Sequence, residues 1–372
     1  GRPVVARKMV TRKGGINMHC LKKINIAVFI IIFILFMLTS CTKPDQTDEH
    51  TKEDKILLGF AMDTLVHERW LRDREIFVSR AKELGAEVIV QTANSDSEEQ
   101  KNQVQYLLDQ GIDVLVLVPH DYEKAAEMVR MAKARGVKVI SYDRLVREAQ
   151  CDLYISFDNI QIGKLMAQTI LKHVSKGNYL ILNGSPTDYN SFMFHEGYMS
   201  VLNQEIKNGN IKIVGETWVR NWLYEEAFQF VDETIRAGKS VDAIIAANDT
   251  LAAAAIDALT ENRMTGKVKV VGHDADLEGC QKIVEGTQLA TIYKPIDEIA
   301  GKAAEYAVNM AKGGMVQAED TINDGKYNIP FYKIEPVLVT KENMVEIIIN
   351  SGFHRLEDIY INVPKDQWPT AQ

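Results

Sequence analysis

Cysteine is scarce in this sequence of 372 residues, which contains four. Cys20 and Cys41 lie in an N-terminal segment, so Cys151 and Cys280 form the one possible pair in the rest of the chain. A single pair cannot make a disulfide framework. A bond between them is possible outside the cytoplasm, but we predict two unpaired, small apolar side chains. CxxC and HExxH motifs are also absent, so we expect no dedicated metal site and no cofactor.

Motifs of common catalytic sites are missing as well. The sequence has no G-x-G-x-x-G and no G-x-S-x-G motif. The stretch "AGKS" at 237–240 follows a predicted helix and has Glu233 where a phosphate-binding loop needs its first glycine. His273 adjoins Asp274 but has no evident serine or cysteine partner. We therefore expect a protein that is not an enzyme.

Acidic residues are absent before Asp45, although the whole chain has a formal net charge of −8. The first 40 residues carry seven Lys/Arg, which leaves 36 basic and 51 acidic residues, or −15, for residues 41–372. This acidic part has no evident basic patch, so nucleic acid would be repelled and is not an expected partner.

The basic N-terminus precedes a nearly unbroken apolar run from Ile24 to Leu38. Two lysines, an apolar run and small residues are the parts of a secretory signal, which we place at residues 18–40. The ending "LTSC" resembles a bacterial lipobox, which implies a lipid on Cys41 and an extracytoplasmic protein anchored to the cell membrane. An uncleaved membrane anchor is the alternative, because the run can just span a bilayer. Residues 1–17 are interpreted as upstream sequence, and 41–54 as a polar tether.

From Lys55 onward, apolar runs alternate with amphipathic helical patterns. "KILLGFA" (55–61) predicts a strand, residues 68–84 predict a helix, and "DVLVLVP" (113–119) has the apolar residues on both faces of a buried parallel strand. The alternation restarts near residue 160. It predicts an α/β fold with two units of similar build, each a parallel sheet covered by helices.

Polar and aromatic residues collect directly after the predicted strands. Ligands of open α/β sheets bind beyond the carboxyl ends of their strands. The residues at these positions are Arg69, Trp70, Asp143, Arg144, Asp158, Asn159, Asp188, Asn190, Trp222, Asn248, Asp249, Asp274, Asp276 and Lys294.

This set of side chains suits a neutral polyhydroxyl ligand. Sugar hydroxyls both donate and accept hydrogen bonds, so carboxylates and amides can face arginine and lysine around them. The C–H faces of a sugar pack on aromatic rings, for which Trp70 and Trp222 are candidates. Alternatives remain for single residues. Asp143, Asn159, Asn190 and Asp249 could merely cap helices, as could Asp276, and Trp70 could be a core side chain.

Several stretches resemble the type I periplasmic sugar-binding proteins of ABC importers, and most of all their D-xylose-binding members. They are "ERW", "ISYDR", "YISFDN", "GSPTDYN", "WVRNWLYEEA", "ANDT", "GHDADLEG", "TIYKP" and "SGFH", in this order between Lys55 and Leu356. The resemblance implies two Rossmann-like lobes joined by three hinge strands, with crossings near 158–162, 293–297 and 333–336. The implied segments are 55–160 with 296–333 for the N-terminal lobe, 161–295 with 334–356 for the C-terminal lobe, and 357–372 as a tail.

The resemblance also implies which residues bind the sugar. Matched motif by motif, they are Arg69, Trp70, Asp143, Arg144, Asn190, Trp222, Asn248, Asp274 and Lys294. His67 and Tyr189 depart from the residues usual in the family, which leaves the preferred sugar open. The implied partners are a monosaccharide, D-xylose first, and the membrane subunits of an ABC importer.

Three other functions are alternatives to sugar import. The same fold could serve as a sugar sensor for a membrane histidine kinase or chemoreceptor. A sugar-responsive repressor would need an N-terminal DNA-binding helix-turn-helix, where this chain has its predicted signal. A glycoside-processing enzyme would need paired carboxylates, for which Asp274 and Asp249 are the candidates.

Overall fold

The computed structural model describes residues 55–370, which belong to one compact unit. The predicted signal at 18–40, the lipidation site Cys41 and the tether up to residue 54 lie outside the described residues. Among the helices of residues 55–370, none is both long and apolar enough to cross a membrane.

The first lobe is built on a seven-stranded sheet with the order β11-β12-β5-β4-β3-β1-β2. Its strands are β1 (Leu57–Met62), β2 (Glu87–Thr92), β3 (Val114–Leu117), β4 (Lys138–Tyr142), β5 (Leu153–Phe157), β11 (Asp320–Asn323) and β12 (Asn328–Ile334). All neighbours are parallel except β11 and β12. The helices are α2 (Glu68–Glu83), α3 (Ser97–Asp109), α4 (Ala125–Ala134) and α10 (Ile296–Ala311). As the apolar run predicts, every residue of β3 is buried.

The second lobe has a four-stranded parallel sheet with the order β7-β6-β8-β9. Its strands are β6 (Gly177–Asn183), β7 (Ile211–Trp218), β8 (Ala243–Ala246) and β9 (Lys269–Val271). An antiparallel pair, β10 (Thr291–Tyr293) with β13 (Val337–Val339), continues it through a single bridge between Val271 and Ala290. The helices are α5 (Asn159–His173), α6 (Tyr189–Lys207), α7 (Tyr224–Arg236), α8 (Asp249–Glu261) and α9 (Leu277–Glu285).

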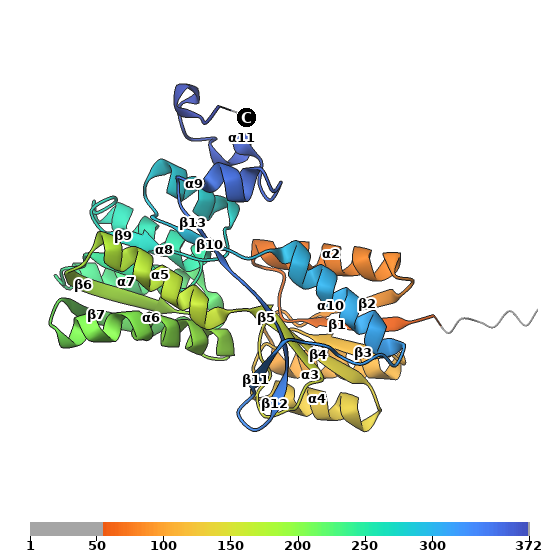
Figure 1. The fold of residues 1–372 in the computed structure, drawn as a ribbon. Helices are drawn as coiled ribbons and strands as arrows, with labels where there is room; N and C mark the ends of the chain where they lie inside the picture. The colour runs from red at the N-terminus through yellow and green to blue at the C-terminus, as the bar shows by residue number, and fades with distance from the viewer. Residues whose placement is uncertain (1–54, 371–372) are drawn as a thin grey trace, which may run out of the picture. The chain divides into compact units, whose positions relative to one another are not determined.

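The chain passes between the two lobes three times (Figure 1). It leaves the first sheet after β5, returns between β10 and α10, and leaves again between β12 and β13. The fold is therefore the two-lobed α/β arrangement of type I periplasmic binding proteins. The lobe boundaries at residues 160, 295 and 333 remain a proposal, which these passages support.

Two parts of the C-terminal region were not predicted. The hairpin of β11 and β12 closes one edge of the first sheet, and its antiparallel pairing departs from the expected parallel sheet. Residues 357–372 were expected to form a tail, yet α11 (Leu356–Ile359) packs on α9, with Ile359 and Tyr360 buried. Two short helices, η2 (Val345–Ile349) and η3 (Lys365–Gln367), flank α11. Burial of these two apolar side chains stabilises the packing of α11 on α9.

Both cysteines of residues 55–370 are free and buried. Cys151 packs in the core of the first lobe, and Cys280 packs in the second lobe beside Ile348 and Ile359. The prediction of two unpaired apolar side chains is confirmed.

Candidate functional site

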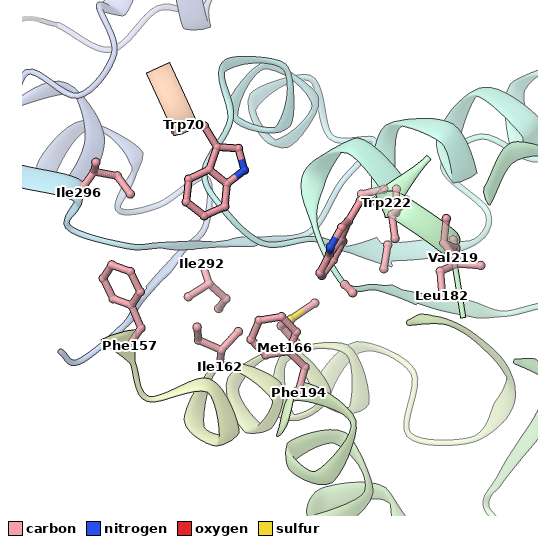
Figure 2. Close-up of a cluster of buried hydrophobic side chains, with 14 of the residues drawn as sticks. Trp70, Phe157, Ile162, Met166, Leu182, Phe194, Val219, Trp222, Ile292 and Ile296 are labelled. Atoms are coloured by element: carbon pink, nitrogen blue, oxygen red, sulfur yellow. The ribbon is translucent and has the colours of Figure 1, made fainter. Parts of the chain in front are cut away.

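A buried pocket between the lobes is lined by polar and aromatic side chains from both of them. The space between its atoms is about 330 Å³, a volume that includes space open to solvent. Figure 2 shows Trp70 and Trp222, which come from separate elements and belong to the same cluster of buried side chains as Phe194. The lining residues are His67, Arg69, Trp70, Asp143, Arg144, Asp188, Asn190, Phe194, Trp222, Asn248, His273, Asp274 and Lys294. All nine residues predicted from the sequence are among them.

Arg69, near the start of α2, lies on one wall of this pocket. Its Nε and Nη2 each donate to a carboxylate oxygen of Asp73 at 3.1 Å, one helical turn further on. Tyr142 also donates to Asp73, and Nη1 of Arg69 lies 2.8 Å from Oδ2 of Asp143. Although burial disfavours the charge, Asp143, Asp73 and Asp274 raise the pKa of Arg69 well above its ordinary value. The guanidinium is thus held rigidly, stacked 4.2 Å from the ring of Trp70.

A second buried guanidinium, Arg144, joins the lobes. It donates through Nη1 to Oδ2 of Asp63 at 2.6 Å in the first lobe. Its Nε lies 2.8 Å from Oδ2 of Asp188, at the start of α6 in the second lobe. His120 contacts the other oxygen of Asp63 at 2.8 Å. These partners fix Arg144 in the pocket wall, 5.4 Å from the ring of Trp70.

Asp274 follows β9 and carries the negative charge of the opposite wall. Its Oδ1 lies 2.8 Å from Nζ of Lys294, 3.3 Å from Nε2 of His273 and 3.9 Å from Nη1 of Arg69. Burial opposes ionisation, but His273, Lys294 and Arg69 together hold the pKa of Asp274 below its ordinary value. The pocket therefore offers an ionised carboxylate as a hydrogen-bond acceptor beside fixed cationic donors.

Trp222 forms part of the second lobe's wall, and its position depends on Gly184. A Cβ atom at Gly184 would overlap Cη2 and Cζ2 of the Trp222 ring and crowd Oγ of Ser191. The backbone of Trp222 has φ 57°, a left-handed conformation that a large side chain seldom adopts. Asp143 and Asp274 also have positive φ, 62° and 103°. Strained backbone conformations of this kind cluster at binding and active sites, where side chains must be held in defined orientations.

The structure shows which of the residues that follow strands cap a helix and which line the pocket. Asn248 does cap α8, because its side chain accepts from the Leu251 N–H at 2.9 Å, while it also lines the pocket. Asp143 and Asn190 are not caps, and Nδ2 of Asn190 lies 3.3 Å from Oδ1 of Asp143 across the lobes. Asp276 precedes α9 without making a side-chain cap. Trp70 is both things proposed for it, a core side chain and a pocket wall.

Four buried polar atoms of the pocket residues have no hydrogen-bond partner within residues 55–370, namely Nε1 of Trp222, Nε2 of His273, Oδ2 of Asp143 and Oδ1 of Asp274. The two carboxylate oxygens lie 2.8 Å from Arg69 and from Lys294, respectively, as ion pairs. The Nδ1 of His273 lies 2.9 Å from the carbonyl of Ala247, so it carries the proton and Nε2 is an acceptor. A buried donor beside buried acceptors favours a ligand that both donates and accepts hydrogen bonds, as a hydroxyl does.

Comparison with known proteins agrees with this geometry. A family model described as "Periplasmic binding protein domain" matches residues 58–315. The chain belongs to the periplasmic binding protein family. It is 43% identical over 316 residues to a D-xylose-binding periplasmic protein of Haemophilus influenzae, covering 85% of this chain and 95% of that protein. Identity to the D-xylose-binding periplasmic protein of Escherichia coli is 41% over 326 residues, or 87% and 98% of the two chains.

Solved structures of solute-binding proteins show the same fold. A carbohydrate transporter solute-binding protein from Chloroflexus aurantiacus, in complex with D-glucose, has a TM-score of 0.76 and 31% identity, covering 81% of this chain and 97% of that one. A solute-binding protein of an ABC transporter from Clostridium phytofermentans, with bound β-D-glucose, has a TM-score of 0.75 and 27% identity, covering 82% and 99%.

Four pocket residues of this periplasmic binding protein were absent from the nine predicted. Asp188 is one of the residues that follow a predicted strand. His67 differs from the residue usual in the family, and His273 precedes Asp274. Phe194 lies on α6, far from any strand end in the sequence, and contacts the His273 ring edge-on at 5.0 Å. Helix periodicity could place Phe194 in the core but could not indicate that this core borders the pocket.

One alternative pairing fails on geometry. Asp249, proposed with Asp274 for a glycosidase, does not line the pocket of this periplasmic binding protein. Its oxygens accept from Gln288 and Thr291, each at 2.8 Å, and from the Asp276 N–H at 3.0 Å. These three donors engage both carboxylate oxygens of Asp249 within the second lobe.

The buried His273 predicts a pH dependence of stability. Burial lowers the pKa of His273 to about 4, below the 6.5 of a free histidine. Between pH 6.5 and pH 4, His273 is therefore protonated in the unfolded chain but neutral in the folded protein. The folded state is thus most stable, with respect to this group, above pH 6.5, and its free energy of unfolding decreases as the pH falls toward 4. At pH 5 the loss amounts to about 2 kcal/mol. Urea unfolding at pH 7 and pH 5 should show this decrease in the free energy of unfolding of the wild type. The decrease should be smaller in His273→Gln.

The exposed His173 supplies the control for this measurement. His173→Gln should keep the wild-type difference between pH 7 and pH 5. An equal difference in His273→Gln and the wild type would show that His273 is not the group responsible.

Proposed function

We propose that this chain is an extracytoplasmic solute-binding lipoprotein that binds a monosaccharide, D-xylose, between its lobes and presents it to an ABC sugar importer. The observation that carries the proposal is the convergence of nine predicted polar and aromatic residues on one buried pocket. The two D-xylose-binding relatives support xylose as the first sugar to test.

The chemistry of the pocket matches a sugar in three ways. Asp143 and Asp274 accept hydrogen bonds from hydroxyls, whereas Arg69, Arg144 and Lys294 donate to them. Trp70 and Trp222 offer flat apolar faces for the C–H groups of the ring. Since the contacts come from both lobes, the closed arrangement binds the sugar more tightly than an open one, and the sugar favours closure.

Calorimetric titration of the purified protein with D-xylose tests this function, with D-ribose, D-glucose and L-arabinose as comparisons. Saturable binding at micromolar or lower concentration to xylose alone is the expected result. Binding to another sugar instead would retain the site and reassign the ligand, with His67 the first residue to examine. No heat with any sugar would reject the proposal.

Two substitutions connect the binding to this pocket. Trp222→Ala removes an aromatic face, and Asp274→Ala removes the acceptor paired with Lys294. Each should weaken sugar binding at least roughly tenfold, the effect of one lost strong contact. Circular dichroism should show both variants folded. Wild-type affinity in both would place the sugar site elsewhere.

Membrane attachment rests on the lipobox, which lies outside the described residues. We propose that Cys41 carries the lipid. Cys41→Ala should release the protein from the membrane fraction of cells, and retention there would favour the uncleaved anchor. Loss of D-xylose uptake on deletion of the gene would support the importer. Unchanged uptake with a lost transcriptional or chemotactic response to xylose would instead favour the alternative function of a sugar sensor.

A further inference from the structure

Contacts between the lobes also occur outside the pocket, on the exposed side of α2. Oε2 of Glu68 accepts a hydrogen bond of 3.0 Å from the Leu277 N–H, at the start of α9 in the second lobe. One turn along α2, Nη2 of Arg72 donates to the Phe353 carbonyl at 2.8 Å. The guanidinium of Arg72 also lies 4.0 Å over the Phe353 ring. Neither Glu68 nor Arg72 lines the pocket.

The contact of Glu68 completes helix α9. The first N–H groups of a helix have no partner within it and are usually satisfied by the side chain before the helix. Asp276 occupies that position in α9 but makes no such hydrogen bond. The carboxylate of Glu68 takes its place, and a negative charge is favoured there by the helix dipole. The second lobe thus receives a helix cap from the first lobe, which separation of the lobes would remove.

The same contacts border directly on the pocket residues. Glu68 precedes Arg69 and Trp70, and Leu277 is the third residue after Asp274. His354, beside Phe353, lies with Nε2 2.8 Å from the Ala275 carbonyl, which connects the Phe353 segment to the loop that carries Asp274. Contacts at Glu68 and Arg72 therefore help to hold Arg69, on the first lobe, and Asp274, on the second lobe, on opposite sides of the pocket.

We propose that Glu68 and Arg72 form a latch that stabilises the closed lobes and so sets the lifetime of the bound sugar. Here "latch" denotes the contacts of Glu68 with Leu277 and of Arg72 with Phe353. The proposal rests on the proposed sugar-binding function. Both residues are positioning residues, because they touch no sugar and act through the pocket residues beside them.

The latch predicts an effect on dissociation more than on association. Its contacts exist only when the lobes are together, so their loss makes reopening easier and leaves the first encounter with the sugar unchanged. The side chain of Glu68 is 43% exposed, which weakens its interaction relative to a buried pair. We expect Glu68→Ala and Arg72→Ala each to raise the dissociation rate and Kd roughly tenfold.

Stopped-flow tryptophan fluorescence with D-xylose measures both rates, since Trp70 and Trp222 lie in the pocket. Glu68→Gln keeps an oxygen that can accept from Leu277 and should recover part of the lost affinity. Glu75→Ala is the matched control: its side chain is 72% exposed on α2, and within the described part of the chain its ion pair is with Arg74. This control should keep wild-type rates.

The melting temperature without sugar separates the latch from a general role in folding. If the latch acts on closure, the sugar-free melting temperatures of Glu68→Ala and Arg72→Ala should equal that of the wild type. Unchanged dissociation rates, or a sugar-free melting temperature lowered in step with affinity, would overturn the latch while the wild type still binds xylose. No sugar binding by the wild type would instead refute the proposed function, and the latch with it.

Discussion

Replacing Arg69 with methionine should lower the free energy of unfolding by about 3–5 kcal/mol and abolish sugar binding. The guanidinium is 5% exposed and pairs with Asp73 and Asp143, which are themselves buried. Methionine fills a similar volume but leaves Asp73 without its cation and Asp143 with the more distant Lys294, 4.0 Å away, and a poorly paired buried charge is costly. Urea unfolding monitored by circular dichroism measures the loss of stability, and calorimetry with D-xylose measures the loss of binding.

Two further variants make this prediction specific. Arg74→Met, on the same helix but 34% exposed, should change the free energy of unfolding by less than about 1 kcal/mol. In the double variant Arg69→Met/Asp73→Asn, a neutral amide replaces one stranded carboxylate, so part of the stability should return while binding stays lost. A loss below about 1 kcal/mol in Arg69→Met would contradict the role assigned to this ion-pair network.

Gly184→Ala should weaken sugar binding roughly a hundredfold, although it adds only one methyl group to a residue that does not line the pocket. The new Cβ would overlap the ring of Trp222, whose backbone is held by hydrogen bonds from the Trp222 N–H to Val219 and from the Asn221 N–H to Ser185. The rigid ring must therefore move, and the expected cost in stability is about 1–3 kcal/mol. Titration with D-xylose and urea unfolding measure the two effects.

Gly301→Ala provides the matched control, because no atom lies within 4 Å of a Cβ added there. It should bind sugar as the wild type does and gain roughly 0.5–1 kcal/mol as alanine replaces glycine inside α10. The double variant Gly184→Ala/Trp222→Ala should bind no more weakly than Trp222→Ala alone, since both act on the same ring. Wild-type affinity in Gly184→Ala would show that the position of Trp222 does not determine binding.

Much of the fold was predictable because its signals are local. The apolar run 113–119 became β3, fully buried, and the helical pattern 68–84 became α2 with Arg69, Asp73, Phe77 and Ala81 on its buried face. The hairpin of β11 and β12 was missed because it lies at a sheet edge. There β11 alternates between half-buried and exposed residues, and Pro330 interrupts the strand pattern of β12.

The candidate site was predictable to the extent that it follows from sheet geometry. Parallel strands end at one edge of a sheet, so residues that follow strands, such as Asp143 and Asp274, collect at the edge where open α/β sheets usually have their ligand sites. Phe194 could not be found in this way because it lies on a helix. The fit of Trp222 against Gly184 also escaped prediction, since nothing local to Gly184 indicates a ring 38 positions away.

Local sequence patterns were enough to predict the alternating elements, the two α/β units and the strand ends that carry the polar residues, because periodicity and turn residues act over a few positions. Three features became evident in the folded protein alone: which carboxylate faces which cation, that Asn248 both caps a helix and lines the pocket, and that Glu68 caps a helix 209 positions away. These contacts depend on how the two lobes pack against each other. A short stretch of sequence does not reveal such contacts, because the packing of whole sheets and helices determines which distant residues meet.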